Sequence, residues 1–163
     1  MSKFIELTQG QQAIVDDADF EYLNQWKWCA HRQPRRSTPN SFNAVRNVQI
    51  NGEKRTILMH RLLMGVTDST ILVDHRDNNP LNNQRENLRV ANHMQNGANR
   101  GLNKNNTTGY KGVSKAKHRY LAQISFNNKR RHLGRFHTAE DAARAYNVAA
   151  TEAFGEFAVL NAL

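Results

Sequence analysis

Four polar residues in the middle of the chain have the types and spacing needed for metal-assisted hydrolysis. Asp74 and His75 are adjacent, and Asn87 and Asn96 follow at intervals that suit a β-hairpin followed by a helix. Carboxylate and amide oxygens are ligands that suit Mg²⁺ or Mn²⁺, rather than a structural zinc. An imidazole near its ordinary pKa can take a proton from water at neutral pH. The set predicts metal-dependent hydrolysis of a phosphodiester, with Mg²⁺ or Mn²⁺ as the cofactor.

The motifs around these residues run from residue 59 to residue 96. They are Met59-His60-Arg61-Leu62, Val73-Asp74-His75, Leu81-Asn82-Asn83, Asn87-Leu88-Arg89 and Asn96. The string resembles the HNH nuclease family in its cysteine-free form, which is common among phage and intron homing endonucleases. The resemblance implies that Asp74 and Asn96 are metal ligands and that His75 is the general base. It also implies that Asn87 bridges the hairpin and helps to orient the base.

Two further residues of this region have both a functional and a structural interpretation. His60 could support the site or contact phosphate, or it could be a structural histidine packed against the hairpin. Asn99 follows Asn96 by three residues and so shares its helix face, where it could brace the metal site or be an ordinary surface residue. In the connecting loop, Asn82-Asn83-Gln84-Arg85 replaces the Asp-Asn-Arg of many family members, which leaves one supporting loop contact in question.

The distribution of charge points to a polyanionic partner. The 163 residues carry a net charge of +9, and between Glu86 and Glu140 there is no Asp or Glu but there are eleven Lys or Arg. Such a block fits binding to nucleic acid, and the alternative is a solvated basic face. The single cysteine, Cys29, excludes an internal disulfide framework and a multi-cysteine zinc site.

The C-terminal third of the chain has the pattern of three strands followed by a helix. Strands are predicted over residues 110–114, 119–126 and 129–136, and Thr138 is placed to cap a helix that Gly155 closes. Residues 109–163 resemble the Apetala-type, ethylene-response-factor-like DNA-binding domain. The matching stretches are Gly109-Tyr110-Lys111-Gly112-Val113, Tyr120-Leu121-Ala122-Gln123-Ile124, Leu133-Gly134-Arg135-Phe136, residues 138–146 and Leu160-Asn161. The resemblance implies a three-stranded sheet that enters the major groove of DNA.

Period-two alternation predicts which side chains of this sheet face outward. Ala122 and Ile124 are expected to point toward the helix, which leaves Gln123 on the outer face. A register slip of one residue would exchange the two faces. The predicted DNA contacts are Lys111, Lys115, Lys117, Arg119, Gln123, Lys129, Arg131 and Arg135.

The remaining elements complete an α+β fold. Residues 1–57 read as a strand-rich scaffold, with a hairpin joined at Asn51-Gly52 and a loop from Arg32 to Asn40. Residues 58–100 are expected to form the HNH module of the ββα-metal type, residues 101–108 a linker, and residues 109–163 a three-stranded antiparallel sheet packed on one helix. No apolar run is long enough for a membrane span, so we expect a cytoplasmic protein of a bacterial or phage-infected cell.

The leading interpretation is a homing-type HNH endonuclease that cuts double-stranded DNA, with nicking favoured because one HNH site suits one strand at a time. A tethered reading domain would add effective concentration to a small catalytic unit. The alternative is a sequence-specific DNA-binding regulator whose nuclease module is degenerate. An RNA-binding protein fits the charge but not the resemblance of the sheet. No membrane or obligate protein partner is indicated.

Overall fold

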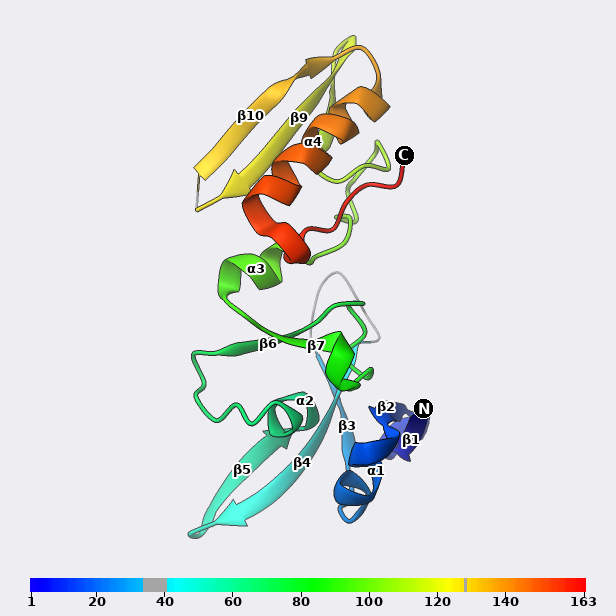
Figure 1. Ribbon diagram of the computed structural model, residues 1–163, viewed down its shortest axis with the longest axis vertical. Helices are drawn as coiled ribbons and strands as arrows, with labels where there is room; N and C mark the ends of the chain where they lie inside the picture. The colour runs from blue at the N-terminus through cyan, green and yellow to red at the C-terminus, as the bar shows by residue number, and fades with distance from the viewer. Residues whose placement is uncertain (34–40, 128) are drawn as a thin grey trace. The chain divides into compact units, whose positions relative to one another are not determined.

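The computed structural model describes residues 1–33, 41–127 and 129–163 and is a mixture of helices and small antiparallel sheets. The chain divides into two compact units, Met1–Ala91 and Asn92–Leu163, called unit 1 and unit 2 below (Figure 1). Most of the predicted loop from Arg32 to Asn40 lies outside the described residues. None of the helices in the described ranges is long and apolar enough to cross a membrane.

Unit 1 contains three small antiparallel sheets, with strand orders β1-β2, β3-β4-β5 and β6-β7. Its strands are β1 (Ser2–Glu6), β2 (Gln12–Asp16), β3 (Cys29–Arg32), β4 (Phe42–Ile50), β5 (Glu53–Leu58), β6 (Leu72–His75) and β7 (Leu88–Ala91). Its helices are α1 (Asp17–Asn24), α2 (Met59–Leu63) and the 3₁₀ turns η1 (Thr8–Gly10) and η2 (Arg85–Asn87). The Asn51-Gly52 turn between β4 and β5 is confirmed, and both residues have the positive φ that a tight hairpin turn requires.

One helix of unit 1 is shorter than its apolar pattern suggests. Phe20, Leu23 and Trp26 have the spacing of one apolar helix face, but α1 ends at Asn24. The chain then turns so that the buried Trp28 indole donates to the Leu23 carbonyl at 2.9 Å and β3 can begin at Cys29. Burial of this large aromatic ring outweighs the local helical pattern.

The N-terminal segment of unit 1 holds the loop that connects β6 to β7. Ile14 of β2 donates its backbone N–H to the Leu81 carbonyl at 2.8 Å and accepts from Asn83 at 2.7 Å. Asn83 is completely buried there. The core beneath is built from β1, β2, α1, α2 and β7, and its largest fully buried apolar side chains are Leu23, Met59 and Val15. The long loop is therefore fixed by backbone pairing rather than left in solvent.

Unit 2 is a three-stranded antiparallel sheet with a long helix across one face (Figure 1). It comprises α3 (His93–Ala98), β8 (Val113–Ala116), β9 (Arg119–Phe126), β10 (Lys129–Phe136), α4 (Ala139–Phe154) and η3 (Gly155–Phe157). Thr138 caps α4 by accepting from the Asp141 N–H, as the sequence predicted, and Gly155 ends the helix with a positive φ. The core lies between Ala122 and Ile124 of β9 and the alanine-rich face of α4.

Close packing between sheet and helix requires a glycine at position 112. Gly112 has φ +74, and a Cβ built on it would meet the Tyr146 ring at 2.0 Å. Tyr146 itself is 4% exposed in the core. The glycine therefore allows α4 to lie directly against the start of the sheet.

The boundary between the units falls after Ala91, whereas the sequence interpretation kept residues 58–100 together. As a result α3, which contains Asn96, is part of unit 2.

Candidate active site

The β6–β7 hairpin of unit 1 carries the adjacent Asp74 and His75. In its antiparallel register Asp74 is opposite Arg89, and His75 is opposite Leu88. Asp74 is 6% exposed and His75 is 8% exposed, so both reactive groups are buried at the end of β6. Buried polar groups of this kind need partners within the protein.

Arg89 supplies an ionic partner for Asp74. Its Nε and a terminal nitrogen of its guanidinium each donate to the same carboxylate oxygen, Oδ2, at 3.0 Å. Each of the two side chains is only 7% exposed. The charge of a predicted metal ligand is thus neutralised by a cation from the facing strand. The sequence contained a signal for this pair, because Asp74 and Arg89 have opposite charges and sit on the two strands of the predicted hairpin.

His60 of α2 packs against His75. The two rings meet edge to face, with centroids 5.0 Å apart and planes inclined by 80°. Burial, helped by the nearby His75 and Arg61, lowers the pKa of His60 to about 3, so His60 is neutral at physiological pH. Its Nδ1 has no hydrogen-bond partner among the described residues. The structure thus places the residue beside the predicted general base, against which it acts as a neutral packing surface.

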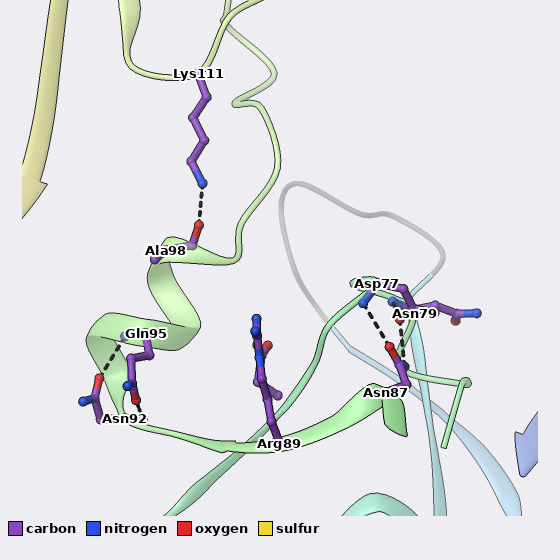
Figure 2. Close-up of polar contacts among 9 residues, drawn as sticks. Asp77, Asn79, Asn87, Arg89, Asn92, Gln95, Ala98 and Lys111 are labelled. Atoms are coloured by element: carbon purple, nitrogen blue, oxygen red, sulfur yellow. Dashed lines mark hydrogen bonds and ion pairs between the residues drawn. The ribbon is translucent and has the colours of Figure 1, made fainter. Parts of the chain in front are cut away.

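Asn87 fastens the loop between the two strands. Its Nδ2 donates to Asp77 Oδ1 at 2.9 Å, and its Oδ1 accepts from the Asp77 N–H at 3.1 Å (Figure 2). The same Nδ2 also donates to the Asn82 carbonyl at 2.8 Å. Asn87 lies in η2, immediately before β7 begins at Leu88. Its amide therefore acts on the loop conformation, and Asp77 is a supporting residue that the sequence interpretation did not select.

The loop segment Asn82-Asn83-Gln84-Arg85, which departs from the family pattern, is held by contacts to the N-terminal segment. Arg85 makes two bonds to the Asp19 carboxylate, at 2.8 Å from its Nε and at 2.7 Å from a terminal nitrogen. Its backbone N–H also donates to Asp16 at 2.8 Å. Two acidic residues far away in sequence thus hold the end of the loop, which single-sequence inspection could not reveal.

Asn96 and Asn99 are placed by α3 in unit 2. Asn92 and Gln95 form a reciprocal capping box at the start of this helix (Figure 2). Asn96 is half-buried on α3, and Asn99 follows the last turn and is 2% exposed. The structure thus brings Asp74, His75, His60 and Asn87 together in unit 1, and it carries the two remaining asparagines on α3.

The two predicted metal ligands are oxygen donors carried by different units. Among the described residues no three His, Cys, Asp or Glu side chains cluster in a way that could hold a metal ion. The carboxylate of Asp74 in unit 1 and the amide oxygen of Asn96 in unit 2 are the donors predicted from the sequence, and both are hard oxygens. Mg²⁺ commonly binds through one or two such groups and keeps several waters, which suits this chemistry.

Lys111 has a structural environment that its predicted role as a DNA contact did not anticipate. Its ammonium donates to the Ala98 carbonyl at the end of α3 at 2.5 Å (Figure 2). It also donates to the Arg100 carbonyl, just beyond the helix, at 2.6 Å. Burial lowers its pKa to about 8. Its backbone N–H donates to Asn161 Oδ1 at 2.6 Å, and Asn161 is held in turn by Asn147 of α4. These contacts fasten α3 to the sheet and helix of unit 2.

The register of the sheet defines the face that α4 leaves uncovered. Ala122 and Ile124 are buried beneath α4, so the alternate residues of β9 face the other side of the sheet. The pairs on that outer side are Leu121 with Arg135, Gln123 with His132, and Ser125 with Arg130. Arg131 pairs with Ile124 and so shares the helix-facing side, which differs from its expected outward position. The cause is a bulge between His132 and Gly134 that shifts the alternation by one residue.

The outer face of the sheet is therefore cationic and polar. It combines Arg119, Arg130 and Arg135, all exposed, with the half-buried Gln123. Lys115, Lys117 and Lys129 are also exposed and lie at the strand ends and in the β8–β9 turn. Arg130 is a candidate that simple alternation misses, and the isolated Gly134 within the strand pattern is the sequence signal that could have indicated the bulge.

Comparison with known proteins identifies one relevant similarity. No family model matches the chain. An uncharacterized HNH endonuclease of Acanthamoeba polyphaga mimivirus is 40% identical to it over 101 residues, which are 61% of this chain and 52% of the viral protein. The chain thus spans about half the length of that relative.

Proposed function

We propose that the chain is a metal-dependent HNH endonuclease that cuts double-stranded DNA, with unit 1 carrying the general base and unit 2 reading the DNA. The observation that carries the proposal is the buried Asp74-His75 pair on the β6–β7 hairpin, braced by Arg89, His60 and Asn87. The similarity to a viral protein named as an HNH endonuclease supports the same class.

His75 is the proposed general base. It would take a proton from the attacking water, and the edge of the His60 ring limits how the imidazole can rotate. Because His60 stays neutral, it adds no fixed positive charge that would oppose protonation of His75 during the reaction. Asn87 contributes indirectly by holding the loop that follows His75.

Asp74 and Asn96 are the proposed metal ligands. A bound Mg²⁺ or Mn²⁺ would neutralise charge on the scissile phosphate and stabilise the leaving 3′ oxygen. Zinc is not expected to serve, because both proposed donors are oxygens, whereas structural and catalytic zinc sites are built mainly from cysteine and histidine ligands. A single general base in one hairpin favours nicking of one strand at a time.

The outer face of the unit 2 sheet is the proposed reading surface. Three exposed arginines flank an outward-facing glutamine, and a β-ribbon of this width can enter the major groove. Some of these side chains would contact only phosphates, which position the protein without specifying a base. We assign this surface to an Apetala-type domain and the whole arrangement to a homing-type enzyme.

The deciding experiment for cleavage is incubation of the full chain with supercoiled plasmid, with Mg²⁺ and with EDTA. We expect conversion to the nicked form only with metal, and loss of that conversion in His75→Ala. His31→Ala is the matched control, because His31 is an exposed histidine on β3 of the same unit. Plasmid binding without nicking by the wild-type chain under every metal condition would favour the alternative, a DNA-binding regulator.

Neighbouring arginines on opposite faces of β10 provide a test of the reading surface. Arg130→Ala should weaken binding to duplex DNA, because Arg130 lies on the outer face, whereas Arg131→Ala should weaken it less. A base-reading arginine should cost about 1–3 kcal/mol at one base position, and a phosphate contact should weaken all sequences alike. Gel-shift titrations at two salt concentrations would measure both. Equal losses in the two variants would contradict the assigned face.

A further inference from the structure

We propose that Arg89 is a positioning residue that serves as the built-in counter-ion of Asp74 and thereby sets the affinity of the site for a divalent cation. This inference rests on the proposed function. It is carried by the geometry of the pair, in which two guanidinium nitrogens donate to one carboxylate oxygen at 3.0 Å and each side chain is 7% exposed.

Burial makes the partnership obligatory in the metal-free protein. An isolated carboxylate removed from water is strongly destabilised, and removing one partner of a buried ion pair leaves the other charge uncompensated. Arg89 holds the Asp74 carboxylate in a fixed orientation before any cation arrives. The hairpin register places the two residues directly opposite each other, so the pair forms whenever β6 and β7 pair.

The Arg89–Asp74 contact stabilises the metal-free protein but opposes metal binding. A divalent cation at Asp74 would share the carboxylate with a fixed positive charge, and like charges in a poorly solvated site repel. Arg89 therefore lowers intrinsic metal affinity while it holds the ligand in place. The expected consequence is a site that is already formed without metal and that binds metal weakly.

The test is thermal unfolding of the full chain in EDTA and across a Mn²⁺ titration. In EDTA, Arg89→Met should lower Tm because the buried Asp74 carboxylate loses its ionic contact with Arg89, and the double variant Arg89→Met with Asp74→Asn should recover part of that loss. In the titration, Arg89→Met should reach its half-maximal Tm shift at a Mn²⁺ concentration at least about tenfold lower than wild type. Asp74→Asn should show no shift.

Two controls separate charge from general stability. Arg89→Lys keeps the positive charge, so its Mn²⁺ midpoint should stay close to that of wild type even if its Tm falls; it also keeps the test usable if Arg89→Met does not fold. Arg85→Met removes another doubly bonded arginine, the partner of Asp19, and should lower Tm without moving the Mn²⁺ midpoint.

Three results would overturn the inference. One is a Mn²⁺ midpoint for Arg89→Met equal to or higher than that of wild type. Another is the absence of any recovery of Tm in the double variant. The last is the absence of a Mn²⁺ shift in wild type while metal-dependent nicking persists, which would leave the proposed function standing and remove Asp74 as the ligand. Absence of both the shift and nicking would reject the proposed function itself.

Discussion

Replacing Lys111 by methionine should loosen α3 while leaving the sheet of unit 2 intact. The substitution keeps the length and apolar character of the side-chain stem but removes the ammonium that donates to the Ala98 and Arg100 carbonyls. These carbonyls lie at the end of a six-residue helix, which is too short to be stable without tertiary contacts. Lys111 therefore contributes a large share of the tertiary stabilisation of α3.

The size of the effect follows from the two lost hydrogen bonds. A hydrogen bond to a charged group contributes about 1.5–3 kcal/mol when buried, and Lys111 is only half-buried, so screening by solvent reduces the sum. We expect a loss of about 1–3 kcal/mol in the local stability of α3. Since about 1.4 kcal/mol is a factor of ten, hydrogen exchange there should accelerate by roughly five- to hundredfold.

Native-state hydrogen exchange can resolve this change residue by residue. The reporters are the N–H groups of Asn96 and Asn99, which donate to Asn92 and Gln95 within α3, and the N–H of Gln123 in β9 is the internal reference. Lys115→Met is the matched control, because Lys115 is an exposed lysine of the same sheet. Unchanged exchange at Asn96 and Asn99 in Lys111→Met would refute the assignment of Lys111 as the anchor of α3.

Three further changes have expected outcomes that can be measured by urea unfolding. Burial lowers the pKa of His60 to about 3, below its value of about 6.5 in the unfolded chain, so the unfolded state takes up the proton first and stability falls as pH drops from about 6.5 toward 3. The slope should be about 1.4 kcal/mol per pH unit near pH 4–5.5, and its persistence in His60→Gln would contradict this origin. Gly112→Ala should destabilise unit 2 by more than about 2 kcal/mol, because the new Cβ would overlap the Tyr146 ring, and a neutral effect would show that α4 can shift freely. Asn87→Ala should cost about 1–3 kcal/mol in unit 1, since Asp77 loses two contacts, and nicking should fall with it; full activity would show that the loop is dispensable.

Much of the secondary structure could be predicted because its signals are local. Asn51-Gly52 demands the positive φ values of a tight turn, and Thr138 can satisfy the free N–H groups at the start of α4 from within the same segment. Such preferences depend on a few neighbouring residues, so they do not require tertiary contacts with distant parts of the chain. The chemical candidates Asp74 and His75 were visible for the same reason, since residue type and spacing alone selected them.

The roles of particular side chains depended on contacts between distant segments. Arg89 became a counter-ion of Asp74 only through strand register. The ammonium of Lys111, a predicted DNA contact, donates to the Ala98 and Arg100 carbonyls, a pairing that depends on how α3 packs in unit 2. One bulged residue reversed the faces of Arg130 and Arg131, which no alternation rule could anticipate. The sequence by itself determined which elements form and which groups are available for chemistry. The tertiary structure decided their partners, because buried charges and N–H groups must be satisfied by whatever the folded chain brings beside them.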